Sequence, residues 1–452
     1  MIQTIRNAWK VQELRNKLLF TVFALLIFRV GCAIPVPFIN GETLAQYMSA
    51  QSATIFGLLN TMSGDAFSQA TLFALSIQPY INASIIIQLL TIAIPALERM
   101  AKEGGEEGKR KIENITRYTT VGIALIQGFG YYTWINYYDQ SGFDMLNAPE
   151  GYGVWVAIVI VAAFVAGSSF VMWLGEQITE FGIGNGISMI LFAGIVARGP
   201  AMVSSIIGGV SNWANDLDPA SYTVLHPVFI PLILVGMLAL VVFIVFITNA
   251  ERRIPVQYAK RVVGRKMYGG QSTHIPIKVN MSGVLPIIFA QSIASLPATI
   301  GMFVPSATQE GTGWNTFLTI FDNTGLVYSI VYFLLIVMFS YFYSTIQFNP
   351  VEVSNNLKKN GGFIPGFRPG KPTTDFLSKV ISRITMFGAI YLAIVALLPA
   401  ITGNIMEAFG SSAGSSLAIG GTSIIIVVGV ALETTKALEA QLMMRHYKGF
   451  LE

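Results

Sequence analysis

Ten long apolar stretches, separated by polar segments, dominate the hydrophobic pattern of the chain. Each is close to the ~20 residues that an α-helix needs to cross the hydrocarbon of a bilayer. Backbone groups in hydrocarbon must be paired within their own segment, so these stretches predict helices; they are too long and too apolar for barrel strands. The stretches lie near 18–36, 72–94, 118–136, 153–173, 183–203, 228–247, 281–304, 326–343, 384–401 and 417–432. The pattern predicts an all-α polytopic membrane protein.

The composition agrees with this prediction. Of the 452 residues, 53% are hydrophobic and 12% are charged, and that charged share is about half of the share in soluble domains. A soluble enzyme of several domains is therefore excluded. The chain has one cysteine, Cys32, so an intrachain disulfide is excluded as well.

Positive charge is distributed on one side of the predicted membrane. All but two of the 28 Lys and Arg residues fall in the N-terminal segment, in alternate loops and in the tail. The two exceptions are Arg29, inside the first stretch, and Arg198, near the end of the fifth. Loops rich in Lys and Arg stay in the cytoplasm. We therefore expect both termini to be cytoplasmic, with residues 1–17 as a basic amphipathic helix.

The ten predicted helices divide into an N-terminal half, 18–206, and a C-terminal half, 207–435, followed by a cytoplasmic tail, 436–452. Because five crossings is an odd number, the second half enters the membrane in the opposite sense, as in an inverted repeat. The second, fifth, seventh and tenth helices carry amides, hydroxyls or glycines at matching places. These groups would be unsatisfied in lipid, so the helices face an interior or, alternatively, only hold one another together.

The sequence offers little chemistry to such an interior. None of the three histidines has a metal-ligand spacing, and the two Gly-rich segments 104–109 and 366–371 are one residue short of a nucleotide-binding loop and lack its Ser or Thr. We expect no catalytic residue, no metal and no cofactor. An ion-coupled transporter would place carboxylates or histidines at mid-membrane, and the stretches are nearly free of both. Arg29 is either a helix-packing anchor or a substrate contact.

Two features of the predicted membrane region are unusual. Residues 52–62 can form about two helical turns, too short to cross the bilayer, and either re-enter the membrane or lie on its outer surface. On otherwise polar helices, Ile77 and Ile81 are four residues apart, and so are Ile187 and Leu191. Such pairs share a helix face and could form a hydrophobic constriction in a wet passage.

Two cytoplasmic loops, about 249–280 and 348–380, exceed what a helix connection needs. Their clustered Arg and Lys suit phosphates of lipid or ribosomal RNA, or acidic protein faces. The alternative is that they only fix the topology. Pro and Gly on both sides of Arg368 favour a shaped turn there.

Several motifs lie in order along essentially the whole chain, at 28–29 with 34–37, 73–81, 182–188, 271–280 and 363–370. Together they closely resemble the SecY/Sec61-alpha family, the large subunits of protein-conducting channels. The resemblance implies two inverted five-helix halves forming a clamshell around a pore that narrows at a ring of apolar side chains. It also implies a plug helix on the outer side and a lateral gate, between the second and seventh helices, that opens to lipid.

Carried over by motif, the resemblance implies four sets of site residues. The pore ring is Ile77, Ile81, Ile187, Leu191, Ile288 and Ile426. The plug, about 54–66, includes Ile55, Leu58, Leu59, Met62, Ser63, Gly64 and Asp65. The lateral gate includes Gln88, Gln291 and Ser292. The partner-docking residues are Arg252, Arg253, Lys260, Arg261 and Arg368.

The resemblance further implies a bacterial plasma-membrane channel for unfolded preproteins, which releases hydrophobic segments into membrane lipid. Its expected partners are the small membrane subunits SecE and SecG, the SecA ATPase, and the ribosome with its nascent chain. Three residues depart from the family pattern: Phe181 replaces an Arg, Asp65 interrupts a Ser-Gly-Gly, and Leu191 stands where Ile is common. The alternatives are a secondary transporter on inverted repeats and a non-conducting insertase or scaffold.

Overall fold

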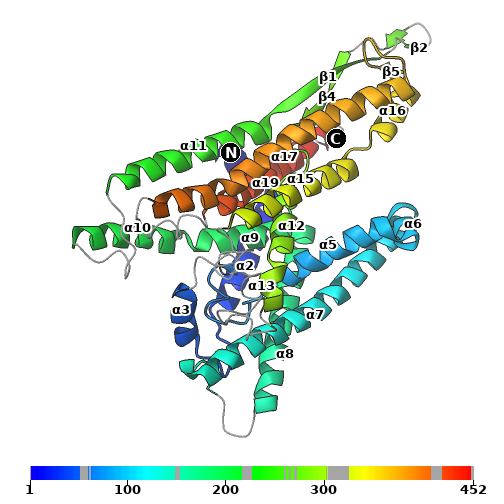
Figure 1. The fold of residues 1–452 in the computed structure, drawn as a ribbon. Helices are drawn as coiled ribbons and strands as arrows, with labels where there is room; N and C mark the ends of the chain where they lie inside the picture. The colour runs from blue at the N-terminus through cyan, green and yellow to red at the C-terminus, as the bar shows by residue number, and fades with distance from the viewer. Residues whose placement is uncertain are drawn as a thin grey trace.

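The computed structural model is mainly helical, as the apolar pattern predicts, and carries two small β-sheets (Figure 1). It describes residues 2–50, 60, 63–147, 153–215, 227–258, 261–263, 266–268, 272–301, 303, 325–408 and 420–448.

The helices of the first half follow the predicted stretches, with several interruptions. They are α1 (Ile2–Lys10), α2 (Gln12–Gly31), α3 (Gly41–Ala50), α5 (Gln78–Ala93), α6 (Pro95–Glu103), α7 (Gly105–Tyr138), the π-helix η1 (Asp139–Phe143), α8 (Gly153–Phe181), α9 (Gly186–Ala197) and α10 (Gly199–Ala214). Helix α7 packs against both α5 and α8 (Figure 1).

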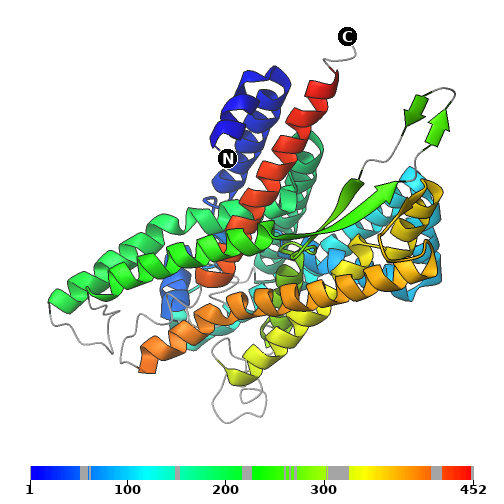
Figure 2. The same cartoon turned by 90° about the horizontal axis from the view of Figure 1, so that it is seen from above.

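The second half carries the strands as well as helices. Its elements are α11 (Phe229–Asn249), β1 (Glu251–Tyr258), β2 (Arg261–Val263), β3 (Lys266–Tyr268), β4 (Ser272–Lys278), α12 (Leu285–Ala294), α13 (Leu296–Gly301), α15 (Leu326–Gln347), α16 (Pro350–Lys359), β5 (Gly362–Phe363), α17 (Lys371–Ala408) and α19 (Gly420–Lys448). Helix α15 lies along α17, and the N-terminal helix α1 packs on α19, the last helix described (Figure 2).

Among the described residues, three helical segments are long and apolar enough to cross a membrane: Gly153–Phe181, Leu326–Lys359 and Lys371–Leu398. A fourth is obtained if α5 and α6, which meet at an angle of 105°, count as one span. Proline contributes to this difference from ten stretches, because it lacks an N–H and interrupts a helix. Pro95 starts α6, and prolines lie in the first turns of α10 and α12.

Three local predictions were wrong. The second stretch is not helical from residue 72, since α5 begins only at Gln78, where Pro79 occupies the first turn and supplies a helical φ angle. The N-terminal helix does not run to residue 17, because extended backbone at Val11 separates α1 from α2. The loop 249–280 contains strands, so the chain is not strictly all-α.

The strands build a small unit from both predicted cytoplasmic loops. Strands β1 and β4 form an antiparallel hairpin in which Glu251 pairs with Lys278, and β5 joins on the other side of β1. Alternate residues of β1, Ile254 and Val256, are buried and pack with apolar residues of α16 and α17. The hairpin projects beyond α17, with β2 and β3 at its far end (Figures 1 and 2).

Candidate functional site

The six predicted ring residues come together in the largest hydrophobic cluster of the described structure. They reach it from α5 and its N-cap, from α9, from α12 and from α19. Five are at most 3% exposed, and the sixth, Ile187, is partly buried and packs against this cluster, which also contains many other apolar residues. Apolar side chains separated by up to 349 positions in the sequence therefore belong to one hydrophobic cluster.

The entry to α9 is built to place its two ring residues. Asn185 is the N-cap, and its side-chain oxygen accepts hydrogen bonds from the backbone N–H of Ile187 and of Ser188, at 3.0 and 3.3 Å. Gly175 of α8 lets α9 approach α8, since a Cβ at this position would lie 3.3 Å from the Cδ1 atoms of Ile190 on α9 and of Ile77 before α5. The motif 182–188 therefore fixes where Ile187 and Leu191 point.

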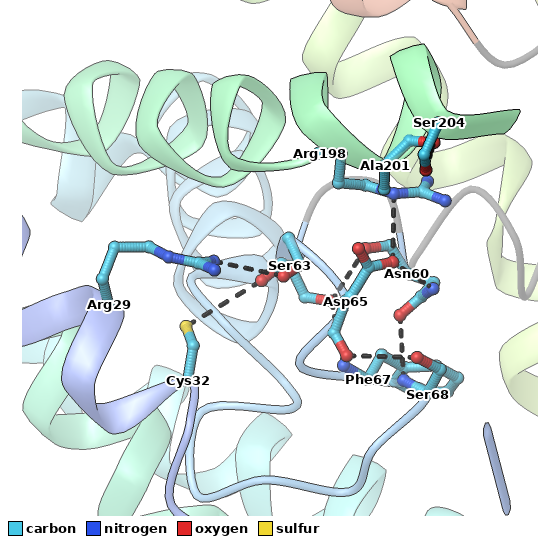
Figure 3. A network of polar contacts seen from close by, with 11 residues as sticks. Arg29, Cys32, Asn60, Ser63, Asp65, Phe67, Ser68, Arg198, Ala201 and Ser204 are labelled. Carbon is cyan, nitrogen blue, oxygen red and sulfur yellow. Dashed lines mark hydrogen bonds and ion pairs between the residues drawn. The ribbon is translucent and has the colours of Figure 1, made fainter. Parts of the chain in front are cut away.

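The predicted plug lies only partly within the described residues. Ile55, Leu58, Leu59 and Met62 lie outside them. Of the plug residues named from the sequence, the structure describes Ser63, Gly64 and Asp65, which we call the plug stem after the predicted plug (Figure 3). Gly64 has φ +67°, and a Cβ on it would meet the backbone oxygen of Gly194 in α9 at 2.8 Å. A glycine is required at this point, both for its backbone angle and for the close approach.

The two arginines outside the basic loops both contact the plug stem (Figure 3). Arg29 Nη1 of α2 donates to the Gly64 carbonyl at 3.2 Å, and Arg198 Nε forms an ion pair with Asp65 Oδ1 at 3.0 Å. The same carboxylate oxygen accepts from Asn60 Nδ2 at 2.9 Å. From the sequence, Arg29 was either a helix-packing anchor or a substrate contact, and its hydrogen bond to the Gly64 carbonyl favours the anchor. The sequence predicted no role for Arg198.

Ser63 and Cys32 add to the same network. Ser63 Oγ accepts from the Phe67 N–H at 3.0 Å, and Asn60 Oδ1 accepts from the Ser68 N–H at 2.9 Å. Cys32 Sγ lies 3.9 Å from the Ser63 carbonyl that it donates to. Side-chain hydrogen bonds therefore stabilise this segment in place of the regular backbone hydrogen bonds of a helix or strand.

The predicted gate residues lie where α5 meets the second half of the chain. Gln78 Nε2 of α5 donates to Ser292 Oγ of α12 at 3.2 Å. Gln291 is buried beside it, and within the described structure its side-chain oxygen accepts no hydrogen bond. Gln88 Oε1 accepts from the hydroxyl of Tyr343 on α15. Gln78 is one of the polar residues that predict an interior-facing second helix, but neither Gln78 nor Tyr343 was among the predicted gate residues. The available signal for Tyr343 was that a buried tyrosine hydroxyl needs a partner.

The predicted docking residues lie on the small β unit and the turn beside it. Arg252 and Arg253 are exposed on β1, and Arg253 Nε pairs with Glu251 Oε1 at 2.7 Å. Arg261 begins β2, and Lys260 lies outside the described residues. Because β5 pairs with β1, the two predicted loops form one surface.

Arg368 is exposed on an ordered turn. Its carbonyl accepts from Thr373 Oγ1 at 2.8 Å, and the preceding Phe367 stacks on Phe376 of α17 with ring centroids 4.1 Å apart. Gly366 and Gly370, at φ +88° and +105°, supply the backbone angles on both sides. The exposed Arg368 side chain therefore lies on a turn of defined conformation.

Charged residues also join the base of the hairpin to α19. Burial lowers the pKa of the Lys436 amine below its ordinary value and Lys278 lowers it further, whereas Glu251, Glu433 and Glu439 oppose the shift. Among the described residues, no group of three His, Cys, Asp or Glu side chains is arranged to hold a metal ion.

The SecY family model matches residues 71–435. The protein translocase subunits SecY of Streptomyces coelicolor and Bacillus subtilis are each 43% identical to this chain, over 458 and 457 aligned residues, and all of each chain is covered.

Solved structures have the same fold. A structure of a protein-conducting channel matches with a TM-score of 0.61 at 17% identity, and Sec61 in the canine ribosome–channel complex from the endoplasmic reticulum matches with 0.58 at 16%. In both, 94% of this chain and 92% of the other are covered. The family model and the full-length relatives together establish that this chain belongs to the SecY family.

Proposed function

We propose that this chain is the central pore-forming subunit of a protein translocation channel in the bacterial plasma membrane, and is not an enzyme. The observation that carries the proposal is the convergence of six apolar side chains from α5, α9, α12 and α19 on one cluster. Such a constriction closes to ions by excluding water. Aliphatic side chains make non-directional contacts, so they can also close around an unfolded chain of any sequence.

The proposed architecture is ten membrane helices in two inverted halves, 18–206 and 207–435, forming a clamshell around the pore. Residues 1–17 and the tail 436–452 lie in the cytoplasm, as the distribution of Lys and Arg favours. Segment 54–66 forms the plug at the outer side of the constriction. The contact of the plug stem with Gly194, one turn beyond Leu191 on α9, supports this position next to the ring.

Lateral release is proposed to occur between α5 and α12. These helices belong to different halves, and the hydrogen bond from Gln78 to Ser292 joins them. Their separation would connect the pore to lipid, so hydrophobic segments would leave by partitioning rather than by sequence recognition.

The driving force is proposed to come from partners docked on the exposed basic surface of β1 and the Arg368 turn. The partners are the SecA ATPase and the ribosome with its nascent chain. The similar structures of Sec61 in a canine ribosome–channel complex and of the yeast Ssh1 complex bound to the 80S ribosome support the ribosome. SecE and SecG are the proposed small membrane subunits. We expect Arg368→Glu to stop SecA-dependent export while the channel still folds and inserts, because the Arg368 side chain is exposed. Normal export by that variant would contradict the docking assignment.

The experiment for the pore is disulfide crosslinking to a translocating chain. Cys32 is replaced by Ser, one cysteine is placed at Ile81 or Ile288, and a stalled precursor carries one cysteine in a hydrophilic stretch. We expect a crosslink from both ring positions. The control is a cysteine at Ile394 on α17, which is 51% exposed and should not react.

The alternatives make different predictions. Failure of both ring positions to crosslink, with the precursor demonstrably engaged, would refute the pore assignment. A non-conducting scaffold requires that outcome, whereas a secondary transporter would show solute-dependent flux instead.

A further inference from the structure

A second hydrogen bond joins the two halves at the proposed gate, and it comes from a helix to which the gate assignment gave no role. The hydroxyl of Tyr343 on α15 donates to Gln88 Oε1 on α5, with 2.5 Å between the two oxygens. The amide of Gln88 is itself oriented, because its Nε2 lies 3.3 Å from Ser84 Oγ, one turn earlier on α5. The acceptor oxygen of Gln88 is thereby directed at the second half.

Tyr343 is held from its own side by the core of the second half. It is 7% exposed, and its ring packs on Phe289 of α12 with centroids 5.1 Å apart. The next residue, Ser344, shares a 2.7 Å hydrogen bond with Thr385 of α17. The ring therefore belongs to the second half, while the hydroxyl reaches across to the first.

The two links are spaced along α5. Gln78 and Gln88 are ten residues apart, or ~15 Å along the helix axis. Gln88 lies toward α6 and the basic segment 99–117, on the side that the charge pattern places in the cytoplasm. Opening α5 away from α12 and α15 must break both links.

A hydrophobic segment that replaces the Tyr343–Gln88 contact offers no polar partner, so the freed hydroxyl and amide become unsatisfied in apolar surroundings. Only a segment with enough apolar surface offsets that cost. We infer that Tyr343 is a specificity-determining residue of the lateral gate: its hydrogen bond to Gln88 closes the cytoplasmic half of the gate and sets how hydrophobic a segment must be to enter lipid. This inference rests on the proposed function.

The experiment uses the complete channel in membranes and a series of test segments graded by their number of leucines. The measured quantity is the ratio of segments released into lipid to segments translocated. Tyr343→Phe removes the hydroxyl and keeps the ring, so we expect the ratio at the wild-type midpoint to rise about three- to tenfold, as for one net hydrogen bond. The midpoint should then shift by about one to four leucines.

The chain offers a matched control on the same helix. The hydroxyl of Tyr341 donates to the Ser382 carbonyl of α17 at 3.2 Å, within the second half. Tyr341→Phe makes the same chemical change without touching the link to α5, so its midpoint should equal that of the wild type.

A double variant tests whether one bond is responsible. Gln88→Met should shift the midpoint in the same direction as Tyr343→Phe, and the combined variant should shift it no further, because both changes remove the same interaction. A Tyr343→Phe midpoint equal to that of Tyr341→Phe would overturn the inference, and so would additive shifts. A wild-type channel that ignores leucine content would refute the lateral gate itself, which distinguishes failure of the proposed function from failure of this residue.

Discussion

The ring cluster and the plug stem meet on the same helix, α9, yet they are held by opposite kinds of interaction. Leu191 packs in the ring, the Gly194 carbonyl contacts Gly64 one turn later, and Arg198 ends the helix in an ion pair with Asp65. The ring has apolar contacts that depend on volume. The stem has hydrogen bonds and an ion pair that depend on direction.

This difference teaches how a pore can be both tolerant and closed. A seal must accept side chains of any passing polypeptide, so it requires contacts without directional preference. A plug must return to one position, so its stem requires contacts that a shifted segment cannot reproduce. We expect substitutions in the two regions to fail in different ways.

The largest effect should come from a charge in the ring. Ile288→Asp removes a side chain whose burial contributes ~1.5–3 kcal/mol and introduces a carboxylate that attracts water. We expect ion conductance of the idle channel in reconstituted vesicles to rise by on the order of tenfold or more. Ile288→Leu is the matched control, with conductance near that of the wild type; equal conductance of both variants would contradict the proposed seal.

A smaller effect should follow from breaking the ion pair of the stem. Asp65→Asn keeps an acceptor for Asn60 and removes only the charge, so it weakens the attraction to Arg198. A partly exposed pair contributes ~0.2–1 kcal/mol, and we expect the idle conductance to rise by a factor of about 1.4 to 5.

The double variant Asp65→Asn with Arg198→Gln serves as the test of coupling. It should conduct no more than the more affected single variant, since both changes remove one interaction. Conductances that multiply would mean that the two residues act separately.

The backbone of the stem gives a third prediction. Asp65 has φ +71°, a conformation that costs a residue such as alanine ~1–2 kcal/mol. Asp65→Gly and Asp65→Ala both delete the carboxylate, but the alanine variant should also be less stable in the membrane. Thermal unfolding of the purified channel is the measurement, and equal melting temperatures would argue against backbone strain at this position.

The smallest effect should come from exchanging one aliphatic ring residue for another. Leu191→Ile keeps the volume of a fully buried side chain, and such exchanges usually cost less than ~1.5 kcal/mol. We expect conductance and export to stay near wild-type values. A leak comparable to that of Asp65→Asn would show that the ring depends on side-chain shape and not only on volume.

The sequence predicted the two regions unequally, for a physical reason. Spacing by four residues is visible in a sequence, so Ile77 with Ile81, and Ile187 with Leu191, stood out as candidate faces. Ile288 and Ile426 were found only through the family motifs, because a single isoleucine in an apolar helix has no distinguishing pattern. The structure places all six in one cluster, although their role as a pore ring stays a prediction.

The polar contacts were harder to predict. Arg29 and Arg198 were recognisable as exceptions to the charge distribution. The contact of Arg29 with the Gly64 carbonyl could not be predicted, because every residue has a backbone carbonyl. Ile254 and Val256 alternate with Arg253, Pro255 and Gln257, a pattern typical of a strand. The many charged residues around them made this pattern hard to recognise.

The direct junction between α11 and the β hairpin has a mechanical consequence. Helix α11 ends at Asn249, β1 begins at Glu251, and Glu251 pairs across to Lys278 at the end of β4. The paired strands are ~25 Å long, and β1 is also paired with β5 and packed on α16 and α17. The hairpin is therefore braced along its length, so a force applied to it is transmitted to α11, α16 and α17 together.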